Sequence, residues 1–209
     1  VEMVARFAEL ARCNVVHYGR SAAPDTVLGV EVRNAVAFLK QCVKPGDKFD
    51  YIVGGLPQVP GTPEALRDPA AVAHLYDPAQ HPAFPEWGLG LLHDVKVAAR
   101  GAFARSGGRL ILVHSGRVPE RARRELDERA GYREIRMLDE TMVRHHPGTP
   151  LRYLFGEGKG FLFADPDGAE GITPEQAERC RVAFTEGRIS EAQYQVYHRL
   201  FAVESEAVW

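Results

Sequence analysis

Short hydrophobic runs alternate with amphipathic segments along the central part of the chain. Runs typical of buried strands lie at Tyr51–Val53 and in GGRLILVHS (107–115), whereas apolar positions at helical spacing predict helices over Leu89–Phe103 and Pro119–Ala130. Proline at the first position of the second helix and Gly131 just beyond its last position support that assignment. Strands that alternate with helices predict a mostly parallel sheet with helices on both of its faces.

Similar patterns flank this central part. Two capping boxes, Thr173–Gln176 and Ser190–Gln193, predict a helix that stops at Gly187 and a second helix that ends near Val203. Together they predict a helical hairpin near the end of the chain. The remaining expected elements are a helix in Val1–Cys13, strands in NVVHY (14–18) and TVLGVEV (26–32), a short helix in Asn34–Cys42, and strands in REIRML (133–138) and GFLFAD (160–165).

Composition narrows the class of protein. The 209 residues carry a formal net charge of -2, so no overall positive field attracts nucleic acid. No apolar run is long enough for a membrane span, and no signal-peptide pattern is present. The cysteines Cys13, Cys42 and Cys180 are scattered, which favours a reducing cytoplasm. His145-His146 lacks a third ligand at a useful spacing, so we expect no metal site.

The stretch DYIVGGLPQVP (50–60) is unusual for the end of a strand. It passes from apolar residues into two glycines, a proline and an amide, and a long proline-rich loop, Pro57–Pro85, follows. The strand that ends at Val113 runs into HSGR in the same way. In sheets built from such units, ligands lie beyond the carboxyl ends of the strands, so we expect both strand ends to face one crevice.

The order of these motifs resembles a known family. Strand, GGLPQ, long loop, helix, glycine turn, strand, helix and GY follow one another as in the second half of a class I S-adenosylmethionine-dependent methyltransferase. The closer resemblance is to the methyltransferase domain of methionine S-methyltransferases, the plant enzymes and their bacterial relatives that feed dimethylsulfoniopropionate synthesis. It covers about Phe49 to Phe201, and the segments that carry it are IVGGLPQVPGTPEA, GLGLL, GRVP with RRELDERAGY, and AFTEGRISEAQYQVY.

One feature of that family is absent from these residues. Class I methyltransferases carry an Asp/Glu-x-Gly-x-Gly loop after their first strand, and this sequence contains no such pattern. Val1–Cys13 resembles the helix that follows the second strand, so we expect that the first quarter of the fold is missing or is supplied by another segment, and that these residues alone bind the cofactor weakly. The expected organisation is a partial Rossmann-like domain over 1–165, with the helical hairpin of 166–209 packed on it.

The resemblance implies methyl transfer from S-adenosylmethionine to the thioether sulfur of methionine, which gives S-methylmethionine. This reaction needs no general base, because the attacking sulfur has a lone pair and no proton to lose. The residues of Gly54–Gln58 would act by positioning the reactants. Two alternatives remain open: an amide or amine N-methyltransferase, although the Asn and Tyr of the Asn-Pro-Pro-Tyr motif are absent here, and a non-catalytic interaction module.

Four residues at the two strand ends are the main candidates for the site. Gly54 and Gly55 would let a ligand approach the backbone, although glycines also mark plain turns. Gln58 would hydrogen-bond the amino-acid end of the substrate, unless it is a solvated loop amide. Arg117 would hold the substrate carboxylate with its planar fork, unless it is a surface arginine near a helix start, and Gly116 before it would give the ligand room.

The other candidates are aromatic or polar residues at the end of the second strand, in or just after the long loop, and near the end of the expected strand 26–32. His114 would hydrogen-bond the substrate, or lie buried with satisfied partners. Aromatic faces attract a sulfonium by cation–π interaction, or simply pack a lid over the site. The aromatic candidates are Tyr76, Phe84 and Trp87. Glu31 and Asn34 would contact the adenine of the cofactor, and Gly54 is a further cofactor-binding candidate. The expected partners are small molecules, with neither nucleic acid nor membrane, and a homo-oligomer is left open.

Overall fold

The computed structural model describes residues 34–42, 48–63, 65–67, 75–104, 107–149, 151, 155 and 163–208. Within them the chain has a mixed α/β fold with one open six-stranded sheet and four α-helices. The strands are β1 (Tyr51–Gly54), β2 (Arg109–Ser115), β3 (Tyr132–Arg144), β4 (Phe163–Ala164), β5 (Glu170–Ile172) and β6 (Tyr197–Ala207). The helices are α2 (Ala35–Gln41), α3 (Gly90–Ala102), α4 (Glu120–Ala130) and α5 (Pro174–Thr185), with 3₁₀ turns at Ala65–Arg67 and Glu191–Gln193.

Part of the expected secondary structure lies outside these residues. The elements expected in 1–13, 14–18 and 26–32 are not described, and neither are residues 160–162 of the expected strand GFLFAD. Of the described helices, none has the length and apolar character needed to cross a bilayer.

The last strand of the sheet lies between two strands that precede it in the chain. β1 pairs in parallel with β2, from Tyr51 opposite Arg109 to Gly54 opposite Leu112. β6 is antiparallel to β2 on one side and to β3 on the other, so β1, β2 and β3 run in one direction and β6 runs against them. β4 and β5 join the other end of β6, where Ala164 pairs with Tyr197. Antiparallel pairs therefore predominate, and the expectation of a mostly parallel sheet was wrong.

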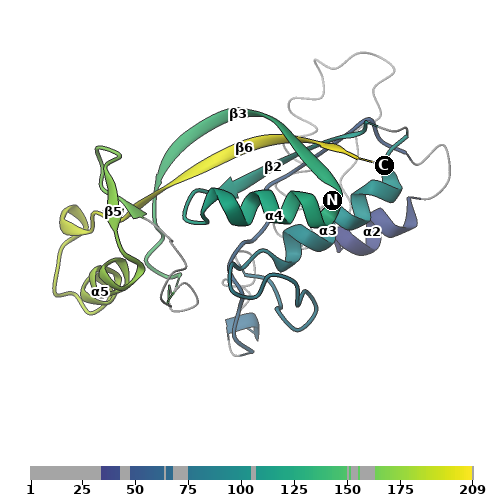
Figure 1. The fold of residues 1–209 in the computed structure, drawn as a ribbon. Coiled ribbons are helices and arrows are strands. Elements are labelled where there is room, and N and C mark those ends of the chain that lie inside the picture. The colour runs from purple at the N-terminus through teal and green to yellow at the C-terminus, as the bar shows by residue number, and fades with distance from the viewer. Residues whose placement is uncertain are drawn as a thin grey trace, which may run out of the picture.

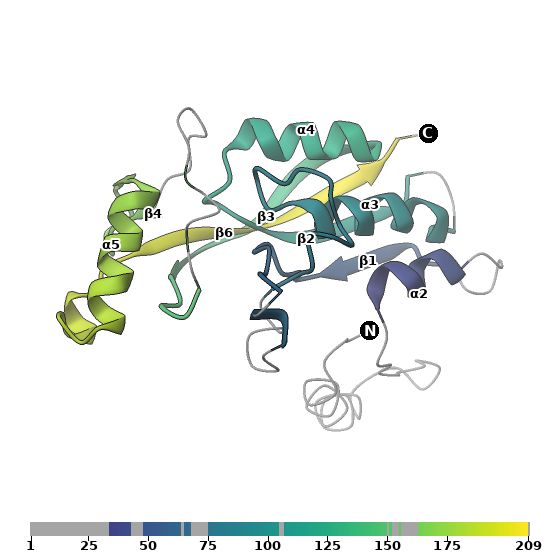
Figure 2. The ribbon, with the colours of Figure 1, turned by 90° about the horizontal axis from the view of Figure 1, so that it is seen from below.

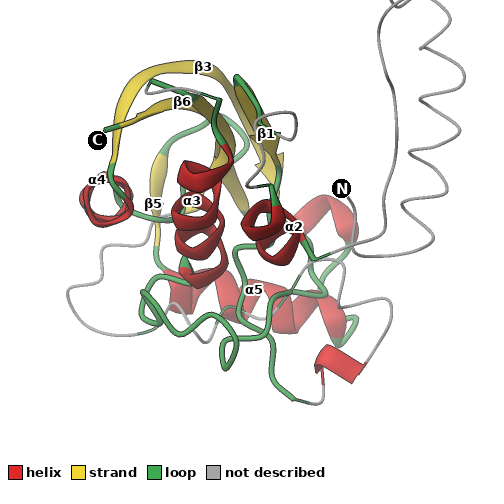
Figure 3. Ribbon diagram, turned by 90° about the vertical axis from the view of Figure 1, so that its right-hand side faces the viewer, coloured by secondary structure: helices red, strands yellow, loops and turns green. Residues whose placement is uncertain are grey.

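The described helices of the main layer lie on one face of the sheet. α2, α3 and α4 run side by side beneath it (Figures 1 and 3), and their apolar faces form the core with the inner residues of β2. Figure 2 shows α5 apart from them, beside β4 at the far end of β6. The opposite face carries exposed side chains such as Tyr51 and Val53. The expectation of helices on both faces thus does not hold for the described helices.

The helices predicted in the centre of the chain are confirmed with small shifts at their ends. α3 buries Leu92, Val95 and Ala99, which recur at helical spacing along its sequence. α4 follows Pro119 as its N-cap and ends at Gly131, whose φ of 76° favours a residue without a side chain. Local sequence signals therefore set both boundaries of α4.

The predicted helical hairpin was wrong in its second half. The capping box at Thr173 does begin α5, as expected. The capping box at Ser190 begins only the 3₁₀ turn Glu191–Gln193, and the chain then forms β6 instead of a helix to Val203. β6 gains backbone partners from β3 along its whole length and from β2 over Leu200–Glu206, and this tertiary pairing outweighs the weak helical pattern. The end of the chain is thus part of the main sheet.

A buried ion pair links the helices to β6. Lys96 of α3 is fully buried, and its Nζ lies 2.7 Å from Oδ1 of Asp127 in α4. The Ser205 hydroxyl of β6 donates to Oδ2 of Asp127 at 3.1 Å, and the Tyr132 hydroxyl donates to the Lys96 carbonyl at 3.0 Å. Burial lowers the pKa of Lys96, and Asp127 opposes that shift. The pair therefore fixes α3 and α4 to each other and to β6.

Candidate functional site

The ends of β1 and β2 form one side of a cavity of about 300 Å³. We call it the strand-end cavity. It is lined by Gly55, Leu56, Pro57, Gln58, Val59, Val113, Ser115, Arg117 and Leu200. The structure thus brings GGLPQ and Arg117 together, as expected from the parallel pairing of the two strands.

Gln58 fastens the GGLPQ segment to the end of β2. Its Nε2 donates to the Val113 carbonyl at 3.0 Å, and its Oε1 accepts from the Ser115 amide at 2.9 Å. The side chain therefore continues the pairing of β1 with β2 by one step after β1 has ended. This geometry gives Gln58 a role in positioning Gly55–Pro57, because both ends of its amide already bind β2.

The glycines of the site serve different purposes. A Cβ added to Gly55 meets no atom within 4 Å, and its φ is not positive, so nothing in the described fold requires a glycine there. Its missing side chain instead leaves space in the strand-end cavity. A Cβ on Gly116 would lie 2.8 Å from the Cβ of Arg199 and 3.0 Å from the Arg199 carbonyl oxygen. Gly116 is therefore needed for packing against β6, and the expectation that it makes room for a ligand was wrong.

The two glycines give a matched test. We expect Gly55→Ala to change the free energy of unfolding by less than about 0.5 kcal/mol, because the added methyl group enters open space. Gly116→Ala should lower it by about 1–3 kcal/mol, because the methyl group overlaps β6. Urea unfolding followed by circular dichroism measures both changes. Equal destabilisation by the two variants would show that Gly55 is also a packing residue.

Arg117 is a buried cation without an acidic partner in the part of the chain that the structure describes. Its side chain is 93% buried, since its residue exposure is 7%, and its Nε donates to the Ser115 hydroxyl at 2.7 Å. No ion pair joins it to a described carboxylate. Burial of a charge without a counter-charge lowers the stability of the fold. An anionic ligand would remove that cost. This is the electrostatic feature that most distinguishes the site.

Arg117 also lines a second cavity, of about 200 Å³, on its other side. We call it the basic cavity. It is lined by Val59, Arg117, Arg144, His145, His146, Thr149 and His198, and no acidic residue is among them. Val59 and Arg117 line both cavities, so they form the wall between them.

Two buried histidines face this basic cavity in their neutral form. Burial, together with the nearby charge of Arg117, lowers the pKa of His145 to about 4 and that of His198 to about 2. Nε2 of His145 lies 2.9 Å from the Thr149 carbonyl, which can only accept, so this nitrogen carries the proton. Sequence reasoning missed His198 as a site residue. Its place follows from the pairing of β3 with β6, in which Val143 lies opposite His198.

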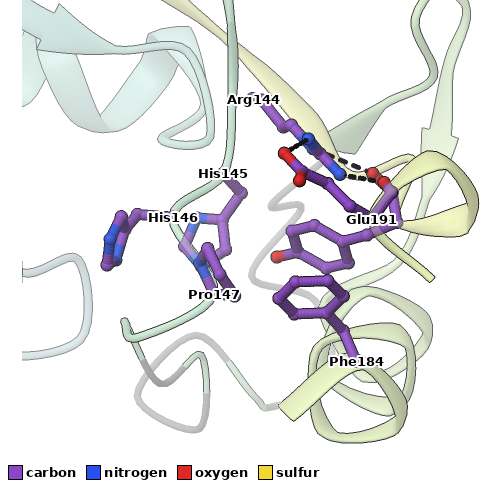
Figure 4. A pocket seen from close by; sticks show the side chains of 7 residues that line it. Arg144, His145, His146, Pro147, Phe184 and Glu191 are labelled. Atoms are coloured by element: carbon purple, nitrogen blue, oxygen red, sulfur yellow. Dashed lines mark hydrogen bonds and ion pairs between the residues drawn. The ribbon is translucent and has the colours of Figure 1, made fainter. Parts of the chain in front are cut away.

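A third cavity, of about 190 Å³, lies beyond His145 toward α5 (Figure 4). The arginine that lines this cavity, Arg144, already has an acidic partner, because it pairs with Glu191 at 3.1 Å. The Nε of Arg144 also donates to the Tyr194 carbonyl at 3.0 Å. The rings of Phe184 and Tyr194 stack at 5.1 Å between their centroids. These contacts join α5 to the end of β3, and they leave Arg117 as the arginine of this region without a described acidic partner.

The aromatic candidates lie apart from these cavities. Phe84 and Trp87 are part of the hydrophobic core. Arginines of α4 already cover their rings, with Arg129 at 4.9 Å from Phe84 and Arg121 at 5.5 Å from Trp87. Tyr76 is buried and forms a bridge with Pro60. None of the three lines any of the three cavities. The structure therefore places them as packing residues.

The polar candidates that do not line the cavities have positions within the fold that explain them without a ligand. His114 alternates with Val113 and Ser115 along β2, so it faces the helices and not the strand-end cavity. Burial, with Lys96 and Arg123 nearby, lowers its pKa to about 3. Asn34 is the N-cap of α2, and its Oδ1 accepts from the Ala37 amide at 3.0 Å. Glu31 lies outside the described residues.

The described residues contain no cluster of three or more histidine, cysteine, aspartate or glutamate side chains arranged to bind a metal ion. No protein-family model matches the chain, and no curated protein shows significant similarity to it. The function must therefore be argued from the site itself.

Proposed function

We propose that the chain transfers a methyl group from S-adenosylmethionine to the thioether sulfur of methionine, and that the described residues form the acceptor side of the site. The observation that carries this proposal is the buried guanidinium of Arg117, which has no acidic partner among the described residues and lies in the wall of a cavity that also contains Gly55. A carboxylate bound to Arg117 would balance its charge, and the space beside Gly55 would admit an unbranched side chain. An amino acid fits both features.

The arrangement of the strands also supports this proposal. We propose that β1, β2, β6 and β3 are the second half of a Rossmann-like methyltransferase sheet. β1 and β2 run in parallel, their carboxyl ends form the site, and α2, α3 and α4 cover one face. Ligands of such sheets lie beyond the carboxyl ends of the strands, which is where the strand-end cavity lies.

The residues of the site would act by orientation. Gln58 holds the GGLPQ segment against β2, Arg117 holds the carboxylate of the acceptor, and Gly55 leaves room beside the reacting sulfur. When bound, S-adenosylmethionine supplies the electrophilic methyl group. The described residues fit its reactive end through the space at Gly55. They offer less to its adenine, because the side chain of Asn34 caps α2.

The test is a direct assay of the product. The 209-residue chain should convert methionine and methyl-labelled S-adenosylmethionine at saturating concentration into labelled S-methylmethionine, detected by mass spectrometry. Calorimetry with S-adenosylhomocysteine reports cofactor binding separately. Binding without label on methionine, but with label on an amide or amine acceptor, would assign an N-methyltransferase. Weak binding is expected of these residues alone, and no transfer of label to any acceptor at saturating cofactor would favour a non-catalytic module.

The reaction should show a flat pH profile. Methyl transfer to a thioether releases no proton from the nucleophile, so we expect kcat to stay constant from about pH 6 to 8. His145, with a pKa lowered to about 4, and His198, with a pKa lowered to about 2, are already neutral in that range and gain a proton only in acid. A rate that rises through neutrality while chemistry limits turnover would indicate methylation of nitrogen or oxygen.

A further inference from the structure

The basic cavity has the chemistry of a carboxylate site. Its lining combines two arginines and three histidines with no acidic side chain. One of the arginines, Arg144, is paired with Glu191, whereas Arg117 has no acidic partner among the described residues. The free positive charge of this cavity therefore lies at its border with the strand-end cavity.

His198 is the second unsatisfied group of the cavity. Only 9% of the surface of this residue is exposed, and its Nδ1 has no hydrogen-bond partner in the described part of the chain. The ring is held in place by His145 at 5.9 Å and by Phe163 at 6.4 Å between centroids, both in edge-on contact. Nδ1 itself is closed to solvent, but the residue lines the cavity and no described group binds either ring nitrogen, so a ring N–H can be turned to a ligand there.

We propose that the basic cavity receives the carboxylate of the acceptor amino acid, with Arg117 and His198 as its two contacts. This inference rests on the proposed function and adds the direction in which the acceptor lies. The side chain of the acceptor would then pass Val59 into the strand-end cavity, because Val59 and Arg117 border both spaces. A guanidinium supplies two parallel donors to a carboxylate, and a neutral imidazole supplies one N–H.

This arrangement predicts the substrate class. The acceptor must have a free carboxylate, so an amide, an ester or a peptide-bound methionine would leave Arg117 and His198 without a partner. It must also have a narrow, unbranched side chain, because that chain has to pass between Val59 and Arg117, the two residues that line both cavities. The enzyme would therefore act on free amino acids with a thioether at the end of the side chain, and not on proteins.

Nuclear magnetic resonance of the histidine rings tests this proposal without any substitution. L-methionine added to the 15N-labelled 209-residue chain should shift the ring signals of His198, and methioninamide should not. Equal shifts with both compounds, or none with either, would overturn the proposal. A shift with S-adenosylhomocysteine but none with methionine would overturn it as well, because the carboxylate would then belong to the cofactor.

A variant gives the second arm. His198→Phe keeps a ring against Phe163 and removes both nitrogens, and we expect it to raise the Kd of methionine about tenfold with little change for S-adenosylhomocysteine. His93→Phe is the matched control, because His93 lies on α3 and lines none of the three cavities.

The two proposals fail in different ways. Methylation of methionine without a His198 signal shift, or with an unchanged Kd in His198→Phe, overturns this inference and leaves the proposed function. Carboxylate-dependent shifts without methyl transfer support the inference and contradict the proposed function.

Discussion

Arg117→Ala is expected to lower kcat/KM for methionine by about 30- to 1,000-fold, which corresponds to about 2–4 kcal/mol of lost transition-state binding. The reason is the environment of this arginine: it is buried, and within the described residues Ser115 is the only side chain to which it donates a hydrogen bond. Without the guanidinium, the carboxylate of the acceptor would lie in a buried cavity without its counter-charge. Steady-state kinetics over a range of methionine concentrations measures the effect.

Three comparisons show whether the loss comes from the carboxylate. Arg117→Lys keeps the charge and loses the planar fork, so it should already weaken methionine. Methioninamide should be a poor acceptor for the wild type and hardly poorer than methionine for Arg117→Ala. Arg124→Ala removes an exposed arginine of α4 that pairs with Glu120, and it should leave kcat/KM unchanged. If replacing methionine by methioninamide lowers kcat/KM equally in the wild type and in Arg117→Ala, the carboxylate binds elsewhere.

The largest expected effect on stability is that of Asp127→Ala. Lys96 is fully buried, and Asp127 is the carboxylate that lies 2.7 Å from its Nζ. Removal of Asp127 would leave a buried ammonium without its counter-charge, and we expect the free energy of unfolding to fall by about 3–5 kcal/mol. Chemical denaturation at neutral pH measures this loss. Lys96→Met in the Asp127→Ala background should recover much of the lost stability, since no buried charge then remains.

The pH dependence of this variant has a definite sign. Burial already lowers the pKa of Lys96 in the fold, and removal of Asp127 takes away the main influence that raises it. The folded pKa of Lys96 in the variant then lies further below its unfolded value. Between those two values the unfolded chain binds more protons, so the stability of the variant should rise with pH. A deficit that stays constant from neutral to alkaline pH would show that Lys96 is not the origin of the loss.

Local sequence signals predicted those elements whose ends depend on local chemistry. The proline and Gly131 marked α4, the capping box at Thr173 marked α5, and the apolar runs marked β1 and β2. The capping box at Ser190 marked only a 3₁₀ turn, because the residues that follow find backbone partners in β2 and β3. Such partners are distant in sequence, so a local pattern carries little information about them.

The residues of the site also fall into those that the sequence could predict and those that it could not. The meeting of GGLPQ with Arg117 follows from the parallel pairing of two successive strands, and that order is readable in the sequence. The position of His198 depends on the pairing of β6 with β3, so no local motif predicts it as a site residue. Phe84 and Trp87 were candidates because they are aromatic and lie in or just after the long loop, and the structure places them in the core.

The position of β6 also bears on how the chain folds during its synthesis. β2 and β3 have their common partner in residues 197–207, which leave the ribosome more than fifty residues after β3. Until then the two strands present unpaired edges toward each other, and such edges promote association between nascent chains. Release of a chain truncated before Tyr197 would make that state permanent. The slow step of refolding should therefore be the insertion of β6 between them, because contacts so distant in sequence form late.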